Sequence, residues 1–341
     1  MYNFSFICRA SKIDKIFSSR FQSFYKKCSV DKHYLTPTLC VEPTTPVARA
    51  ALRSLNRSAN PKHPFFVITR KSKAMTYLWI LLAVSFAASA VGWIYFIYFF
   101  SIGYGLSIAA LAATTSIIFA DRITLPAAIF CCTLFIYGLR LAGYLFVREK
   151  KSQSYKQILY EPGSKERKPL PTMFTIWISC ALLYVGQTSP ITFYLYNLQH
   201  NGSTINLWVW CSTLISITGA IIEVIADTHK SITKKKNPTQ FMSTGLYRIV
   251  RCPNYFGEIL LWTGSFIICF GASCTPWQWI IASLGYAGII YVMFSGARRL
   301  EQRQQKTYGS DPEFQAYINK RPLLIPFMPI YSLEKQKWLK A

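Results

Sequence analysis

The stretch from Thr76 to Ala120 constrains the fold most, because it runs for about 45 residues without a charged side chain. A membrane-spanning helix needs about 20 consecutive apolar residues, so this stretch is long enough for two spans. Gly103 and Gly105 place the expected break between the two helices near Ser101–Gly105. A chain with such a segment is expected to lie in a bilayer.

Further apolar segments follow along the chain, and they bring the expected total to about seven transmembrane helices. These segments are Leu125–Val147, Thr172–Tyr194, Leu207–Asp227, Ile259–Cys274 and Trp277–Gly296. The predicted fold class is therefore all-α, a polytopic membrane bundle over residues 76–330. A basic N-terminal tail, residues 1–75, precedes it, and a short basic tail, residues 331–341, follows it. No Gly-rich phosphate loop follows a predicted strand, which excludes a Rossmann domain.

The basic residues, which give the chain a formal net charge of +24, are placed unevenly. They gather in Arg148–Lys168, Lys230–Arg251 and Arg298–Lys340. Two expected spans separate each neighbouring pair of these segments, so all three can share one face, which is expected to be cytosolic. A nucleic-acid-binding protein would carry its arginines on mostly polar elements, so nucleic acid is not an expected partner.

The N-terminal tail is basic, poor in acids and rich in serine, and its apolar residues fall roughly on one helical face. This pattern is typical of a transit peptide, which would direct the chain to a mitochondrion or plastid. A basic tail that lies on anionic lipid has the same pattern, and it leaves the endoplasmic reticulum open as the location. Three expected spans place this tail across the membrane from the other basic segments, and a targeting segment, cleaved or read separately, removes this conflict.

The cysteines and histidines show no metal-ligand spacing. The chain has 10 cysteines and 4 histidines, and no C-x-x-C motif occurs among them. We therefore expect no metal site, and we interpret most of the thiols as small packing residues.

Several charged residues lie inside the expected spans, where each needs a partner or a role in a site. Arg140 follows Tyr137 by three residues in mid-span. It either pairs with Glu223 or extends to the membrane surface, or it serves a site. Glu223, Asp227 and Lys230 form one helical stripe. This stripe is either a plain salt-bridge stripe, or a place where Asp227 and Lys230 meet the ribose or phosphates of a ligand.

The segment Ser243–Trp262 passes from a basic loop into an apolar helix. Gly245 predicts a turn, and Pro253 predicts the first position of the helix. The free backbone N–H groups at this helix start follow Arg248 and Arg251, which together predict an anion site that suits a diphosphate.

The helix that begins at Pro253 carries a polar face. Asn254, Glu258 and Trp262 follow one another at four-residue steps, and Tyr255 adjoins Glu258. A polar pair backed by an indole suits an amide or sugar together with a flat ring. The alternative is a tightly packed helix start, in which Gly257 permits the close approach of a neighbour.

The C-terminal segment carries Glu301, Tyr308, Tyr317 and Arg321, followed by Pro-Leu-Leu-Ile-Pro-Phe. A polar segment that returns to apolar residues predicts a lid over the ligand site at the start of the helix that begins at Pro253. An interfacial anchor belt has the same composition.

These motifs together resemble the signature of the steroid 5α-reductase C-terminal domain superfamily, in particular its branch of uncharacterised membrane oxidoreductase-like proteins. The matching residues are Leu139-Arg140-Leu141, Arg148, Glu223, Asp227, Lys230, Gly245-Leu246-Tyr247-Arg248, the run from Arg251 to Glu258, Trp262, Tyr317 and the run from Arg321 to Phe327. The resemblance extends roughly from Tyr77 to Pro329.

The resemblance implies a membrane enzyme that binds NADPH at its cytosolic face and reduces an activated C=C bond in a hydrophobic lipid or steroid-like substrate. In such relatives the positions matching Asp227, Asn254 and Glu258 contact the cofactor, as does the tyrosine and arginine tail. With the basic residues and Tyr255 described above, the candidate cofactor-binding residues are Asp227, Lys230, Arg248, Arg251, Asn254, Tyr255, Glu258, Tyr308, Tyr317 and Arg321. Tyr137 and Glu223 are the candidates for the catalytic pair that handles the substrate oxygen.

The chain departs from this family at Cys252, where the family usually has a histidine. Either a cysteine suffices there for packing, or the affinity for the cofactor is altered. The Arg-x-Pro-x-Tyr pattern also resembles isoprenylcysteine and phospholipid methyltransferases, which bind S-adenosylmethionine. Asn254 with Glu258 favours the reductases. A non-catalytic lipid-binding protein with the same fold is a further alternative, and Cys252 is its main support.

Overall fold

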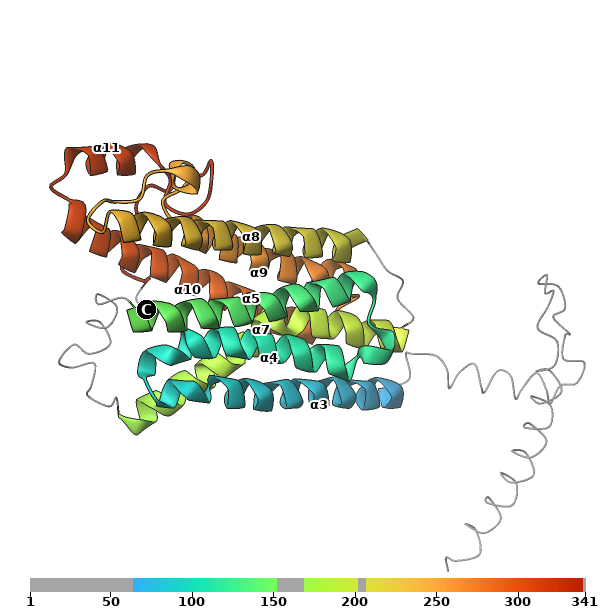
Figure 1. Ribbon diagram of the computed structural model, residues 1–341. Helices are drawn as coiled ribbons and strands as arrows, with labels where there is room; N and C mark the ends of the chain where they lie inside the picture. Colours follow the sequence, from blue (N-terminus) through green and yellow to red (C-terminus); the bar gives the residue numbers. More distant parts are fainter. Residues whose placement is uncertain (1–63, 152–168, 202–206, 340–341) are drawn as a thin grey trace, which may run out of the picture. The chain divides into compact units, whose positions relative to one another are not determined.

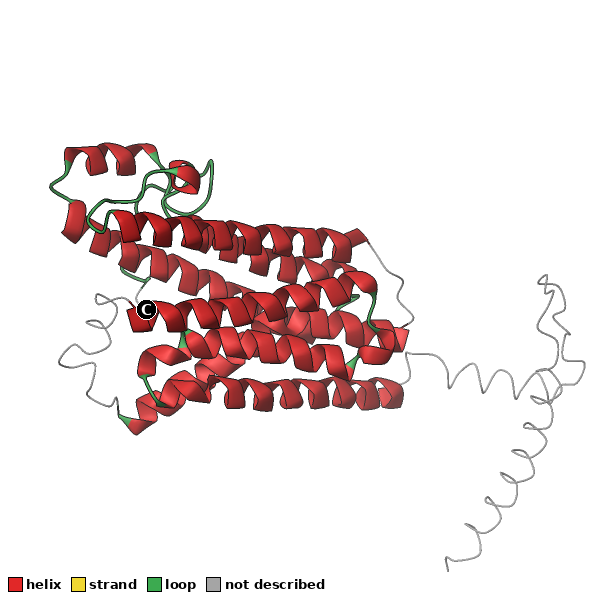
Figure 2. Ribbon diagram, in the orientation of Figure 1, coloured by secondary structure: helices red, strands yellow, loops and turns green. Residues whose placement is uncertain are grey.

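The computed structural model describes residues 64–151, 169–201 and 207–339, and in these ranges the chain forms helices and loops and no strand (Figures 1 and 2). The helices are α3 Pro64–Ser89, η1 Ala90–Trp93, η2 Phe96–Phe99, α4 Ile102–Ile118, η3 Ala120–Arg122, α5 Leu125–Lys151, α7 Leu170–Asn201, α8 Leu207–Lys236, η4 Gly245–Arg248, α9 Pro253–Gly271, α10 Pro276–Tyr308 and α11 Pro312–Lys320. The predicted all-α fold is confirmed. The chain divides into two units, Met1–Phe66 and Val67–Ala341, and the rest of the description concerns the second. The predicted targeting segment lies almost entirely outside the described residues.

Six helical segments of the described chain are long and apolar enough to cross a membrane. They are Met75–Trp93, Phe96–Ile118, Leu125–Arg148, Leu170–His200, Leu207–Lys236 and Pro276–Tyr308. The chain is therefore a multi-pass helical membrane protein. The remaining expected span falls in α9, which has 19 residues. It is not among the six, because Asn254 and Glu258 near its start make it less apolar.

The break between the first two spans lies earlier than the sequence predicts. Helix α3 ends at Ser89, and two short 3-10 helices precede the start of α4 at Ile102. Gly103 and Gly105 lie inside α4 and do not interrupt it. A Cβ atom on Gly105 would lie 2.6 Å from the carbonyl oxygen of Gly138 on α5. The predicted break was wrong because Gly105 serves a helix contact.

Glycines also bring α8 and α9 into backbone contact. A Cβ on Gly219 would lie 2.4 Å from the Gly257 carbonyl oxygen, and a Cβ on Gly257 would lie 2.6 Å from the Gly219 carbonyl oxygen. The close approach at Gly257, which the alternative interpretation of this helix start predicts, is therefore present. Small residues of this kind let helices in a bilayer pack by van der Waals contact, where no hydrophobic driving force between them is available.

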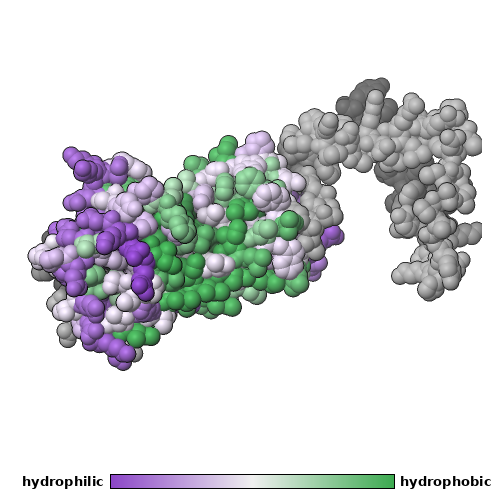
Figure 3. Space-filling view, turned by 90° about the horizontal axis from the view of Figure 1, so that it is seen from above, coloured by the Kyte–Doolittle hydropathy of each residue, from purple (hydrophilic) through white to green (hydrophobic). Residues whose placement is uncertain are grey.

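The hydrophilic residues gather at one end of the helices, and a hydrophobic belt covers the part beyond it (Figure 3). At this end the Lys234 ammonium of α8 donates to the hydroxyl of Tyr308, the last residue of α10, over 2.7 Å. Helix α11 begins after Asp311, whose carboxylate accepts hydrogen bonds from the backbone of Glu313 and Phe314. A carboxylate at this position satisfies N–H groups that the helix itself leaves free.

The segment after α11 folds back onto the bundle. The Leu323 N–H donates to the Ile330 carbonyl over 2.8 Å, which closes a loop. Beyond it, the Tyr291 hydroxyl of α10 donates to the Trp338 carbonyl over 3.2 Å, and Leu339 is buried. The described part of the short basic tail, up to residue 339, therefore packs against α10.

The glycine contact between α8 and α9 makes a testable prediction. The substitution Gly219→Ala should destabilise the protein by about 1–3 kcal/mol, because the new methyl group overlaps the backbone of α9. Gly143→Ala on α5 is the matched control, since a Cβ there meets no atom within 4 Å. That control should be neutral, or stabilising by up to about 1 kcal/mol. Unfolding in detergent micelles measures both, and equal effects of the two substitutions would contradict the packing described.

Candidate functional site

A buried ion-pair cluster joins α5 to α8. Arg140 donates from Nη1 to Oε1 of Glu223 over 2.9 Å and from Nη2 to Oδ2 of Asp227 over 2.7 Å. The two acids lie four residues apart on α8, so both carboxylates face the same neighbour. The expected pairing of Arg140 with Glu223 is confirmed, and Asp227 is a second partner. One guanidinium therefore bridges two carboxylates inside the helical bundle.

A second buried group joins α4 to α9. The Tyr104 hydroxyl donates to Oε1 of Glu258 over 2.7 Å, and the Trp262 indole N–H donates to the Tyr104 hydroxyl over 2.8 Å. Glu258 and Trp262 use the shared helix face that their spacing predicts. The buried Glu258 carboxylate is therefore held by the Tyr104 hydroxyl, and this group has no counter-ion of its own among the described ion pairs.

Two polar atoms between these groups have no hydrogen-bond partner among the described residues. They are the Tyr137 hydroxyl and Oε2 of Glu223, and both are buried. The Tyr137 hydroxyl interacts electrostatically with Glu223, Glu258 and Tyr104, but it forms no hydrogen bond of acceptable geometry with them. Buried polar groups are nearly always paired, so these two atoms are available to a bound molecule or an ordered water. The structure thus brings the two predicted catalytic residues into one cluster.

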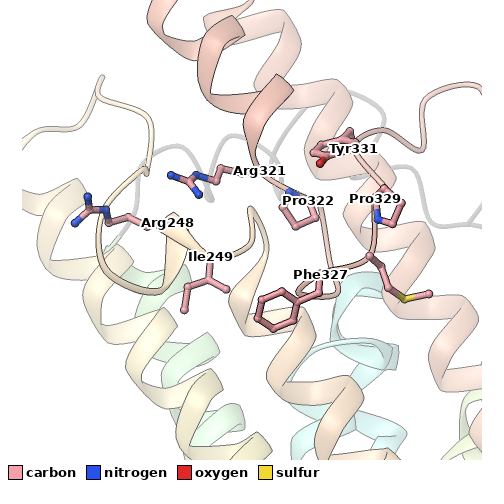
Figure 4. Close-up of a pocket in the computed structure, with 8 residues that line it drawn as sticks. Arg248, Ile249, Arg321, Pro322, Phe327, Pro329 and Tyr331 are labelled. Atoms are coloured by element: carbon pink, nitrogen blue, oxygen red, sulfur yellow. The ribbon is translucent and has the colours of Figure 1, made fainter.

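An open pocket of about 410 Å³ lies at the hydrophilic end of the bundle (Figure 4). Its lining residues are Arg248, Ile249, Arg321, Pro322, Phe327, Met328, Pro329 and Tyr331. The guanidinium groups of Arg248 and Arg321 extend toward the same side of this pocket (Figure 4). Both side chains are exposed, and neither forms an ion pair with an acid in the described part of the chain. Two unpaired arginines at one opening are suited to bind an anion.

Arg251 takes a different place from Arg248. Its side chain is buried, donates to the Tyr331 carbonyl over 2.8 Å and lies 3.4 Å from the Glu301 carboxylate. Its backbone N–H donates to the Pro322 carbonyl over 2.9 Å. Arg251 therefore holds the C-terminal segment onto the start of α9, whereas Arg248 remains open to solvent. Pro253 begins α9 as predicted.

Tyr308 and Tyr317 serve the attachment of α11. Tyr308 accepts the hydrogen bond from Lys234, and the Tyr317 hydroxyl donates to the Tyr247 carbonyl over 2.7 Å. The rings of both residues pack on Phe241, with centroid distances of 6.1 Å and 5.6 Å. Burial raises the pKa of the Tyr317 hydroxyl, so this group stays a neutral donor at physiological pH.

Three other predicted cofactor-binding residues, Asn254, Tyr255 and Lys230, belong neither to the open pocket nor to the buried hydrogen-bonded groups. Asn254 is half-buried and forms no hydrogen bond with the described residues. Tyr255 faces α10, where a Cβ on Gly296 would lie 3.4 Å from its hydroxyl. Lys230 is half-buried and interacts electrostatically with Asp227. All three residues are partly exposed, and none of them lines the open pocket.

Sequence reasoning missed Tyr104, the residue that binds Glu258. It is a single phenol between Gly103 and Gly105 in an apolar span, and such an isolated polar group is a signal in a membrane helix. Its partner Glu258 lies 154 residues further along the chain. Only the tertiary structure brings Tyr104 of α4 and Glu258 of α9 together.

Cys252, which stands at the position of the family histidine, is a packing residue. Its side chain is fully buried, and its backbone N–H donates to the Leu323 carbonyl over 2.9 Å. Burial raises the pKa of the Cys252 thiol to about 12. The thiol is therefore neutral and unreactive at physiological pH.

The fold and the buried cluster define a polytopic helical membrane protein with a polar site inside its bundle. The chain belongs to the family described as "Protein of unknown function (DUF1295)", whose model matches residues 99–321. This range contains both the buried cluster and Arg321.

A similar protein is the uncharacterised protein C9.08c of Schizosaccharomyces pombe. It is 26% identical over 209 residues, which cover 55% of this chain and 67% of that protein. No solved structure matches the chain.

The double ion pair of Arg140 makes a second testable prediction. The substitution Arg140→Met should destabilise the protein by about 3–5 kcal/mol, because it leaves two buried carboxylates without their ion-pair partner. The triple variant Arg140→Met, Glu223→Gln, Asp227→Asn should regain most of this loss. Arg122→Met, at an exposed position of η3, serves as the control and should have little effect. Unfolding in detergent tests the series, and a triple variant as unstable as the single one would contradict the pairing.

The burial of Cys252 makes a third testable prediction. N-ethylmaleimide should not modify Cys252 in the folded protein between pH 7 and pH 9, because a thiol with a pKa of about 12 holds its proton in that range. After denaturation the same thiol should react completely. Mass spectrometry of the labelled peptides measures both states, and the half-buried Cys274 provides an internal comparison. Labelling of native Cys252 that rises between pH 7 and pH 9 would contradict its burial.

Proposed function

We propose that this protein is an integral-membrane reductase that uses NADPH to reduce an activated C=C bond in a hydrophobic lipid or steroid-like substrate. One observation carries the proposal: the Tyr104–Glu258 hydrogen bond lies in one buried cluster with the unpartnered Tyr137 hydroxyl and the unpartnered Glu223 oxygen. Polar atoms of this kind inside a membrane bundle are functional by default. The resemblance to the steroid 5α-reductase superfamily supports the same activity.

The residues present fit a nucleotide cofactor. Arg248 and Arg321 offer two unpaired guanidinium groups at an open pocket, which suits the phosphates. Asn254 and Asp227 would bind polar groups of the ribose or the nicotinamide amide, and Lys230 adds a cation beside Asp227. When bound, the nucleotide supplies the hydride for the reduction.

The residues of the chain would orient the substrate and handle the proton. In this proposal the Tyr137 hydroxyl donates a hydrogen bond to the carbonyl oxygen of an enone and gives it a proton as charge develops there. Glu258, held by Tyr104 and Trp262, fixes the polar wall of the site. The surrounding helices exclude water, which strengthens these electrostatic interactions.

The substrate would enter from the bilayer, since the hydrophobic belt of the helices adjoins lipid. A lipid carrying an enone is therefore the substrate class that we propose. The membrane would be that of the endoplasmic reticulum, a mitochondrion or a plastid. The transit-peptide pattern of the N-terminal tail supports a mitochondrion or a plastid.

Cofactor binding tests the proposal. NADPH should raise the thermal unfolding temperature of the purified full-length chain in detergent, whereas S-adenosylmethionine should not. The double variant Arg248→Gln, Arg321→Gln should bind NADPH at least about ten-fold more weakly, because it loses charge-assisted hydrogen bonds to phosphate. Arg303→Gln, at an exposed position of α10, is the matched control and should bind normally.

The other outcomes identify the alternatives. A shift with S-adenosylmethionine and none with NADPH would replace the reductase by a methyltransferase. The absence of a shift with either nucleotide would indicate a lipid-binding protein without catalysis. Binding of NADPH that survives in the double arginine variant would overturn the assignment of the phosphate pocket.

A further inference from the structure

A second set of polar side chains lies deeper in the bundle than the Tyr104 group. Its members are Ser107 on α4, Gln187 on α7 and Ser265 on α9, and all three are buried. Each of them lies three residues after an aromatic residue that belongs to the Tyr104–Glu258 group or contacts it. These aromatic residues are Tyr104, Tyr184 and Trp262, and the rings of Tyr104 and Tyr184 lie 5.2 Å apart. The repeated spacing on three helices indicates a second polar layer.

The three helices run in the same direction, so the second layer is one turn deeper on each. Between α4 and α7, the Tyr104–Tyr184 contact is followed by a hydroxyl contact of 3.3 Å between Thr115 and Thr192. Both residue numbers increase together, as they must in parallel neighbours. Three residues of α-helix correspond to a rise of about 4.5 Å.

Helices α7 and α9 show the same order. The Ser265 hydroxyl donates to the Gln187 carbonyl over 3.0 Å, and further along the Asn197 amide donates to the Ala272 carbonyl over 2.8 Å. The starts of both helices lie at the basic end of the bundle. The polar layer of Gln187 therefore lies farther from that end than the Tyr104 group does.

The side-chain amide of Gln187 has no hydrogen-bond partner among the described residues, although the residue is only 2% exposed. Neither Nε2 nor Oε1 is paired, and the buried Ser107 hydroxyl also lacks a partner. A buried amide left without partners destabilises the folded protein, because it has lost its hydrogen bonds to water and gained none in return. A membrane interior offers no bulk water to compensate, so such an amide is expected to meet a polar group of a ligand.

The backbone carbonyl groups around Gln187 have hydrogen-bond donors, so the missing hydrogen bonds are those of side chains. Pro190 lies inside α7 and has no N–H, so the Gly186 carbonyl lacks its usual helical donor. The Ser189 hydroxyl donates to that carbonyl over 2.8 Å, and Ser265 covers the Gln187 carbonyl. Among the described residues at this depth, the unpaired polar atoms are therefore those of side chains.

We propose that Gln187 and Ser107 bind a hydroxyl group of the substrate, one helical turn deeper than the polar group held by the Tyr104 cluster. A ligand hydroxyl donates to Oε1 of Gln187 and accepts from its Nε2 or from Ser107, so it satisfies the amide in both of its roles. The inference rests on the proposed function for the reaction. It adds that the substrate is an amphiphile with two separated oxygen functions rather than an enone on a plain hydrocarbon.

A pair of synthetic probes tests this subsite on the full-length chain in detergent. One probe is a bicyclic enone with an octyl chain, and the other carries one additional hydroxyl on the ring remote from the enone. Binding is measured by thermal shift, and turnover by the consumption of NADPH. The wild type should bind the hydroxylated probe about ten-fold more tightly, which corresponds to one well-formed buried hydrogen bond.

The variants separate recognition from structure. Gln187→Leu should bind both probes equally and retain wild-type affinity for the plain enone. Without a probe it should unfold at a higher temperature, because an unpaired amide is removed. Ser107→Ala should reduce the preference for the hydroxylated probe. Thr188→Val is the matched control on α7, since the Thr188 hydroxyl bonds only to its own helix, and it should keep the full preference.

The outcomes distinguish this inference from the proposed function. A binding preference that depends on Gln187, without consumption of NADPH, supports the subsite and contradicts the reductase. Consumption of NADPH without any preference supports the reductase and overturns the subsite. A Gln187→Leu variant that loses stability and keeps the preference would show that the amide binds an ordered water instead, and this also overturns the inference.

Discussion

Arg140 and its two carboxylates are the interaction on which the rest of the site depends. A charged guanidinium inside a membrane bundle needs a partner, and the half-buried Arg140 pairs with Glu223 and Asp227 at 2.9 Å and 2.7 Å. This cross-link holds α5 against α8. Gly219 and Gly257 then bring α9 into backbone contact with α8, and Glu258 on α9 reaches Tyr104 on α4. Side chains from four helices, α4, α5, α8 and α9, thus form one polar centre.

At the basic end of the bundle, some polar residues hold the C-terminal segment in place, and others line the open pocket. Arg251 forms an ion pair with Glu301 and donates a hydrogen bond to the carbonyl of Tyr331, so it holds the C-terminal segment against the bundle. Arg248 and Arg321 line the open pocket and form no ion pair with an acid among the described residues. Tyr308 and Tyr317 bond to α8 and to the η4 segment rather than to the pocket. Residues that look alike in the sequence therefore divide into those that hold the fold together and those that are left to meet an anion.

Much of this arrangement could be predicted from local patterns. Hydrophobic length predicts the spans, and Pro253 predicts the start of α9. Gly245 predicts a turn, and its φ angle of 60° is one that side-chain-bearing residues rarely adopt. The break before α4 was misplaced, because a glycine in a membrane helix marks either a break or a close contact and the sequence does not distinguish them.

The sequence by itself determined the membrane architecture, the basic end and the polar face of α9, because each follows from residues within one or two helical turns of one another. It also limited the partners of Arg140, since few acids lie in the spans. Only the tertiary structure decided that Tyr104 binds Glu258, that Arg251 faces inward, and that the Gln187 side chain has no partner in the described part of the chain. These outcomes depend on how helices distant in the chain rotate and pack, and helical periodicity carries no information about which face meets which neighbour.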